Sequence, residues 1–187
     1  MRLTSVTLRN CRLHRELKVD FDPARTLIGG PNETGKSTLI ETVHRALFLK
    51  AKGNTEHHRA MNSSLHLGHP EVELAFEAGG ISYLLKKRFG SAGTTTLAPS
   101  NSVLLSGDAA EIELARLLSA EAGLSGKAIS VQWAHLWVWQ GQAGADPSAH
   151  ATAQQDGLLR RLQQMGGRRC PPVRTRCPRG KAFRRRQ

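Results

Sequence analysis

The sequence predicts an α/β domain, and three patterns support this fold class. Runs near the N-terminus alternate polar and apolar side chains with the period of two that is typical of half-buried strands. A glycine-rich loop then stands between a short apolar run and an amphipathic helical pattern. Further along the chain, two more alternating runs flank a Gly-Gly turn, which indicates a β-hairpin.

The first elements follow from these patterns in order. Residues 3–8 and 17–21 are expected to form two strands, with a polar turn at residues 10–14. The run at residues 26–28 is short and apolar and stops at Gly29-Gly30, which predicts a buried strand leading into a loop. The helix expected over residues 36–50 has its apolar side chains at three- and four-residue spacing, namely Leu39, Ile40, Val43, Ala46 and Leu47.

The middle of the chain predicts a loop, a hairpin and a second helix. Residues 54–70 are polar and without period, so we expect a loop with solvated histidines rather than a zinc site; the histidines are His57, His58, His66 and His69. Residues 72–76 and 81–85 predict the hairpin, and residues 86–88 predict its exposed end. The second helix is expected over residues 108–122, capped by Asp108, with an apolar face of Ile112, Leu114, Ala115, Leu117 and Leu118.

Charge and composition exclude several classes of protein. The chain of 187 residues has a formal net charge of +12, but eleven of its 27 basic residues and none of its 15 acidic residues lie in positions 160–187. The preceding part therefore carries 16 basic against 15 acidic residues, a net charge of +1. No apolar run reaches the roughly 18 residues that a membrane span needs. Three cysteines do not make a disulfide framework, so we expect a cytoplasmic protein without a membrane partner.

One motif carries chemistry. The pattern GxxxxGK[ST] occurs between the short apolar run and the helical pattern, as a phosphate-binding loop requires. Its glycines let the backbone curl so that successive N–H groups face phosphate oxygens at the positive end of the helix. Lys36 would reach the β- and γ-phosphates, and the Ser37 hydroxyl would coordinate Mg²⁺. The expected nucleotide-binding residues are Gly30, Pro31, Asn32, Glu33, Thr34, Gly35, Lys36, Ser37 and Thr38.

The loop and the N-terminus together resemble a known family. Gly-Pro-Asn-Glu-x-Gly-Lys-Ser-Thr, after an opening of the form Met-Arg-Leu-x-x-Val-x-Leu-x-Asn, resembles the head domain of SMC-like ABC ATPases, which include RecF, RecN, SbcC-type and YhaN-like proteins. This resemblance implies a P-loop NTPase lobe with a mixed sheet and an antiparallel β-hairpin layer. It also implies ATP and Mg²⁺ as cofactors, a second head domain as partner, and engagement with DNA.

The resemblance extends to a second motif. The stretch at residues 136–142 resembles the Q-loop of the family, a Gln-Gly pair that ends an apolar strand. By this resemblance Gln140 would contact Mg²⁺ and the attacking water, and so act in catalysis together with Lys36. Gln142 is the alternative residue for this role. The three tryptophans lie at residues 133–139, in an apolar segment where packing is the simpler interpretation than base stacking.

Two family motifs are missing from the sequence. No stretch gives four apolar residues followed by Asp-Glu, as a Walker B strand requires. Residues 105–108 and 124–127 contain Leu-Ser-Gly but lack the second glycine of the family signature, and both precede Gln140, so we interpret them as turns beside helices. We therefore expect the N-terminal lobe of a longer ATPase, with a missing C-terminal lobe, that binds nucleotide weakly and hydrolyses it negligibly alone.

The C-terminal part has a different composition. We expect an ordered domain over residues 1–145 and a disordered tail over residues 146–187, which is rich in Gly and Pro and then in Arg. Three origins of the tail stay open: a nucleic-acid-binding extension, a solvated terminus, or the product of a shifted reading frame, which the abrupt change of composition favours. The alternative function is accordingly nucleic-acid binding through the basic tail. Cys170 and Cys177 lack metal-site spacing.

Overall fold

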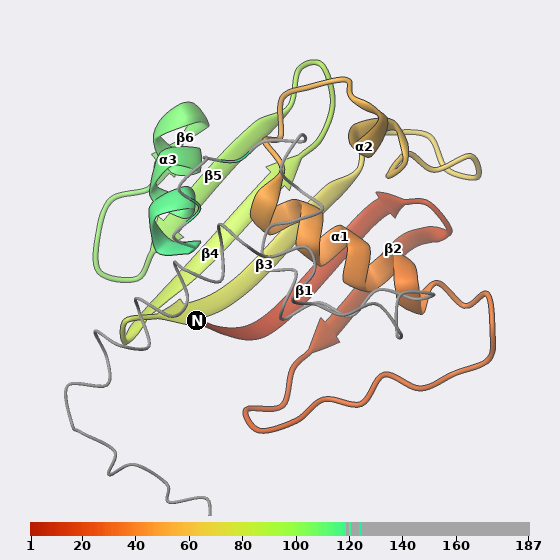
Figure 1. Cartoon of the computed structure of the whole chain (residues 1–187), viewed down its shortest axis with the longest axis horizontal. Helices are drawn as coiled ribbons and strands as arrows, with labels where there is room; N and C mark the ends of the chain where they lie inside the picture. Colours follow the sequence, from red (N-terminus) through yellow and green to blue (C-terminus); the bar gives the residue numbers. More distant parts are fainter. Residues whose placement is uncertain (119, 121–123, 125–187) are drawn as a thin grey trace, which may run out of the picture.

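The computed structural model describes residues 1–118, 120 and 124 of the chain. Its described part is a six-stranded sheet in the order β2-β1-β3-β4-β5-β6, in which every neighbouring pair of strands is antiparallel. Helices α1 and α3 pack on one face of this sheet (Figure 1). The elements are β1 Arg2–Cys11, β2 His14–Asp20, α1 Lys36–Phe48, α2 Glu56–Arg59, β3 Glu71–Ala78, β4 Ile81–Arg88, β5 Thr94–Pro99, β6 Leu105–Ser106 and α3 Gly107–Leu118.

The two N-terminal strands are confirmed, with a tighter turn than the sequence predicts. β1 and β2 pair so that Val6 lies opposite Val19 and Leu8 opposite Leu17. The turn leaves Arg12 and Leu13 outside the strands, and Arg12 adopts the left-handed conformation with φ 49°. Arg12 N–H donates to Met61 O at 3.1 Å, and this hydrogen bond holds the end of the hairpin against the segment after α2.

The strand predicted at residues 26–28 is wrong. This segment lies in a long loop between β2 and α1 that runs out beyond the sheet, and Leu27 is 95% exposed (Figure 1). A strand needs a neighbour that satisfies its main-chain N–H and C=O groups, and none of the strands in the described part of the chain lies beside this segment. Asp22 orders the start of the loop instead, because its Oδ1 accepts from the N–H groups of Ala24 and Arg25.

Helix α1 is confirmed, and its predicted apolar stripe forms the centre of the core except at Ile40, which is exposed. Leu39, Val43 and Leu47 are at most 2% exposed, and the helix contacts β1 and β3. The helix ends at Phe48, two residues before the predicted end. Because the core fixes the helix on the sheet, it also fixes the position of the loop that precedes its first residue.

The segment at residues 54–70 differs from the predicted loop. It contains the short helix α2, and His58 is buried rather than solvated. Its Nε2 lies 2.9 Å from Lys50 O, which accepts, and its Nδ1 lies 2.8 Å from Thr55 Oγ1. Burial lowers the pKa of His58, and both ring nitrogens have partners within the fold, so this histidine has a packing role. Among residues 1–118, 120 and 124, no group of three side chains is arranged as metal ligands.

The hairpin of β3 and β4 is confirmed, but its predicted exposed end is wrong at Lys87. Tyr83, Leu85 and Lys87 share one face of β4 by the alternation of the strand, and this face is buried, with Lys87 only 2% exposed. The Lys87 ammonium donates to Leu49 O at 2.7 Å, so the burial is paired with an acceptor. Strand β5, which the sequence did not predict, pairs with β4 so that Leu97 lies opposite Leu85.

The second helix is confirmed in place, and its predicted apolar face packs on the core at every position but Ile112. The helix runs over Gly107–Leu118 and so ends before the predicted residue 122. Ile112 is 70% exposed, while Glu111 is buried at 7% exposure together with Leu114 and Leu118. The carboxylate of Glu111 accepts at 2.8 Å from both Ala51 N–H and Thr95 Oγ1. These two hydrogen bonds explain why α3 turns Glu111, and not Ile112, toward the core. Asp108 lies inside the first turn instead of capping it.

Several predictions lie outside the described residues. These are Gln140 and Gln142, the aromatic segment at residues 129–139, the domain boundary at residue 145, and the tail with Cys170 and Cys177. Within the described part, the helices are too short and too polar for a membrane span.

Candidate phosphate-binding site

The candidate site is the loop at residues 29–35, which enters the first turn of α1. Gly30 has φ 153° and Gly35 has φ 85°, two conformations that side-chain-bearing residues rarely adopt. Glu33 also lies in the left-handed region, with φ 65°. Leu39 N–H donates to Gly35 O at 3.0 Å, so the helical hydrogen bonds begin at Gly35. The motif therefore curls back on itself and then passes directly into a helix.

Lys36 closes the loop. Its Nζ donates to Gly30 O at 2.8 Å and to Pro31 O, and it lies 3.4 Å from Thr34 Oγ1. Thr34 Oγ1 itself donates to Pro31 O at 3.0 Å. The ammonium group thus contacts two carbonyl oxygens of the loop. To bind a phosphate, it would leave these oxygens. A polyphosphate offers stronger acceptors than these carbonyls, because both partners are then charged.

The start of α1 suits an anion. Gly35 has no side chain with which to cap the helix, and the first turn, Lys36-Ser37-Thr38, contains no acidic residue. The N-terminal end of this 13-residue helix is positive because its first main-chain N–H groups have no partner within the helix. Ser37 is exposed, whereas the side chain of Thr38 is buried at 6% exposure. Thr38 would therefore contribute through its main chain, and Ser37 through its hydroxyl.

The hairpin of β1 and β2 also contacts the loop, which sequence patterns did not reveal. His14 Nε2 lies 3.2 Å from Gly35 O. Arg12 Nη2 lies 2.9 Å from Glu41 Oε2 on α1, and Arg45 Nη1 lies 3.2 Å from the same oxygen. Burial lowers the pKa of Arg45, and Glu41 opposes this shift. These contacts depend on how the hairpin packs on the helix, so no local sequence pattern predicts them.

The described geometry accommodates only part of the predicted site. The motif residues Gly30 to Thr38 form one loop and the first turn of α1, and the Lys36 ammonium lies against the carbonyl oxygen of Gly30. Gln140, the second expected Mg²⁺ ligand, lies outside the described residues. Its role stays a prediction.

Comparisons with known proteins identify the family. Residues 5–120 match the family model described as AAA domain. A DNA double-strand break repair Rad50 ATPase from Halobacterium salinarum is 30% identical over 95 residues, which cover 50% of this chain and 10% of that protein. A DNA replication and repair protein RecF from Lactococcus lactis is 35% identical over 63 residues, which cover 34% of this chain and 17% of that protein. The chain thus spans about a tenth of the length of the Rad50 relative it matches.

A solved structure shows the same fold. It comes from work described as "Structural biochemistry of ATP-driven dimerization and DNA stimulated activation of SMC ATPases", and it superposes with a TM-score of 0.53 at 16% identity. The match covers 86% of this chain and 98% of that chain. The predicted fold class, an α/β P-loop NTPase lobe of the SMC head type, is thereby confirmed. The described strands form an antiparallel sheet, however, and not the predicted mixed sheet.

Proposed function

The chain belongs to the AAA domain family and has the fold of the N-terminal region of an SMC-like ABC ATPase head, and on this premise we propose that residues 30–38 bind ATP together with Mg²⁺. The observation that carries the proposal is the position of Lys36, whose ammonium lies over the loop carbonyls at the start of α1. A cation held there, beside the positive end of a helix, makes a site for a polyphosphate.

Each part of the motif has a distinct role in this proposal. The main-chain N–H groups at the start of α1 bind phosphate oxygens, and Lys36 neutralises the β- and γ-phosphates. Mg²⁺, when bound, offsets negative charge on the phosphates. The Ser37 hydroxyl would hold this ion, and Gln140 would supply a second ligand. The glycines at Gly30 and Gly35 permit the curl that brings these groups together.

Binding and hydrolysis are separate tasks, and we assign only the first to these 187 residues alone. Phosphoryl transfer also needs a carboxylate that holds the metal and positions water, and groups that stabilise the γ-phosphate in the transition state. The sequence contains neither a Walker B motif nor a complete signature. A second head, or a C-terminal lobe, would supply them. DNA maintenance is the process we propose for the complete assembly, because the Rad50 and RecF relatives are described as DNA repair proteins.

The experiment is a titration of the chain with a fluorescent ATP analogue in the presence of Mg²⁺. Replacing Lys36 by Ala removes at least two charge-assisted hydrogen bonds, each worth about 1.5 kcal/mol, so affinity should fall by about 100-fold. Lys18→Ala is the matched control. Lys18 is an exposed lysine on β2 whose Nζ lies 3.5 Å from Asp20 Oδ1, and its loss should leave affinity unchanged.

Equal affinities of the parent chain and Lys36→Ala would refute the proposal. The nucleic-acid alternative makes a different prediction for the same samples. It requires tight, salt-sensitive DNA binding that disappears when residues 160–187 are deleted, regardless of Lys36.

A further inference from the structure

The first residue of β2, His14, contacts the phosphate loop where the loop becomes helix α1. Gly35 is the last residue before α1, and its carbonyl oxygen accepts from Leu39 N–H at 3.0 Å. The same oxygen lies 3.2 Å from His14 Nε2 on the second strand. A carbonyl oxygen only accepts, so Nε2 is the donor in this contact.

The imidazole also packs directly on the backbone of Gly35. A Cβ placed on Gly35 would lie 2.3 Å from His14 Nε2 and 2.6 Å from Cε1. The ring therefore occupies the space that any side chain at this position would need. Together with φ 85°, this close approach explains why glycine is required where the loop becomes a helix.

The orientation of one peptide unit follows from these contacts. The Gly35 carbonyl and the Lys36 N–H belong to the same planar trans peptide, so the two groups point in opposite directions. When His14 and Leu39 hold the carbonyl on one side, the Lys36 N–H is aimed to the other. This N–H is one of the donors that the phosphate loop presents to its ligand.

A second contact makes the turn a firm support. Arg12, two residues before His14, binds Glu41 on α1 at 2.9 Å and donates through Nε to Ala60 O at 2.7 Å. The turn is thus fixed to the helix and to the segment after α2, and His14 projects from this support onto the loop.

We propose that His14 is a positioning residue of the nucleotide site, which fixes the Gly35–Lys36 peptide through its hydrogen bond to the Gly35 carbonyl and so orients the phosphate-binding N–H group. This inference rests on the proposed function, because it assumes that the loop binds phosphate. It predicts that loss of the donor weakens binding of the phosphates themselves.

The test measures affinities for Mg²⁺-ATP and for tripolyphosphate, which lacks the nucleoside. His14→Ala should weaken both by about tenfold, the effect of one hydrogen bond lost. His14→Gln, which keeps a side-chain N–H donor, should stay within about threefold of the parent chain, whereas His14→Leu, which fills space without a donor, should behave as His14→Ala. His57→Ala is the control, since His57 is another half-buried histidine, on α2, and its affinities should equal those of the parent.

The outcomes separate the inference from the proposed function. If Lys36→Ala weakens binding by about 100-fold while His14→Leu binds as tightly as His14→Gln, His14 is not a positioning residue and the nucleotide site stands. If Lys36→Ala changes nothing, the proposed function itself fails. If His14→Ala is unstable, circular dichroism will show the loss of structure. The comparison of His14→Gln with His14→Leu then tests the inference, because both larger side chains preserve the packing.

Discussion

Two lysines show how the setting of a single residue decides its role. Lys36 lies in the phosphate loop, where its ammonium can exchange carbonyl oxygens for phosphate oxygens. Lys87 lies in the core at 2% exposure, where it donates to Leu49 O. Burial lowers the pKa of Lys87 to about 8, and the nearby carboxylate of Glu111 opposes this shift. The first lysine is the one we propose to bind phosphate, and the second joins β4 to the end of α1.

The burial of Lys87 predicts how the free energy of unfolding changes with pH. Its pKa is about 8 in the folded protein and 10.5 in an unfolded chain, so the unfolded chain binds more protons between these values. The free energy of unfolding should therefore rise from pH 8 to 10.5 by roughly 3 kcal/mol through this group. Urea unfolding of the parent chain and of Lys87→Met measures it.

The comparison of the two proteins removes other contributions. Burial raises the pKa of Cys11 to about 12, which lowers stability as the pH rises above 9, but Cys11 is present in both proteins. Lys87→Met should lack the rise that the parent shows. Identical pH profiles for the two proteins would contradict a buried, weakly basic Lys87.

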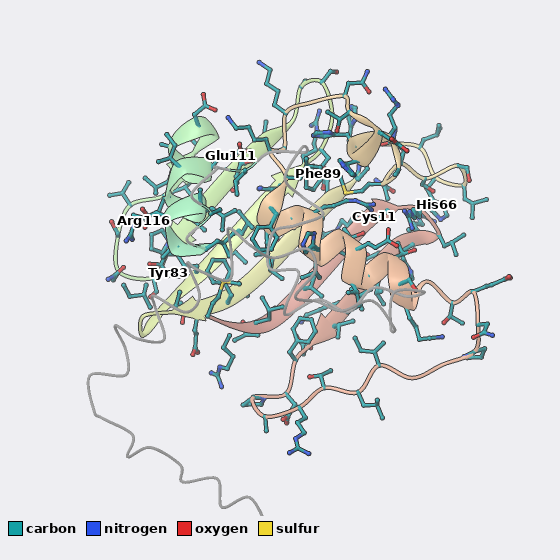
Figure 2. All side chains as sticks on the ribbon, in the orientation of Figure 1. Cys11, His66, Tyr83, Phe89, Glu111 and Arg116 are labelled. Atoms are coloured by element: carbon teal, nitrogen blue, oxygen red, sulfur yellow. The ribbon has the colours of Figure 1, made fainter. Side chains whose placement is uncertain are left out.

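At the scale of elements, the junction after α1 depends on close packing against the β4–β5 turn. Gly90 N–H donates to Ala51 O at 3.1 Å, and Gly53 N–H donates to Gly90 O at 2.9 Å. Glu111 on α3 accepts from Ala51 N–H in the same region, and Figure 2 shows Glu111 and Phe89 near the same end of the sheet. At the opposite end of these elements lie Tyr83 and Arg116 (Figure 2). The helix that carries the phosphate loop is thus tied at its C-terminal end to the strands and to α3.

This junction predicts a strong effect of Gly93→Ala. A Cβ at Gly93 would lie 2.1 Å from Ala51 O and 2.7 Å from Lys52 N, and backbone atoms cannot move away cheaply. We expect a loss of about 3 kcal/mol in the free energy of unfolding, as for overpacking in a core. Gly79→Ala is the control: no described atom lies within 4 Å of its Cβ position, and its φ of 59° should cost about 1 kcal/mol. Similar losses in the two variants would mean that the junction is less tightly packed than described.

At the scale of the whole molecule, the sequence predicts those features whose cause is local. The phosphate loop and α1 follow from motif spacing and apolar period, and the β3–β4 hairpin follows from alternation around Gly79-Gly80. Three failures have a common physical reason, which is that the deciding partner lies elsewhere in the chain. Residues 26–28 lack a neighbouring strand among the described elements. Lys87 is buried because Leu49 O accepts a hydrogen bond from it. Glu111 takes the buried position expected for Ile112 because Ala51 and Thr95 donate to it.

We also expect negligible ATP turnover by the chain alone, because its sequence lacks a Walker B motif and a complete signature. Each missing group that positions water or stabilises the γ-phosphate typically costs about 10²–10³ in rate. Phosphate release from Mg²⁺-ATP by the purified chain should therefore stay near the uncatalysed background. A steady rate that Lys36→Ala removes would show that these residues suffice for hydrolysis.

The central claim is that the loop at residues 30–38 is the nucleotide site, and hydrogen exchange measured by mass spectrometry tests it most directly. Addition of Mg²⁺-ATP should slow exchange in peptides that cover residues 29–38 and the first turn of α1, and Lys36→Ala should remove this protection. Peptides from β3 to β5 should exchange as before. Measurable ATP binding without protection of the loop, or with protection confined to other segments, would contradict the claim.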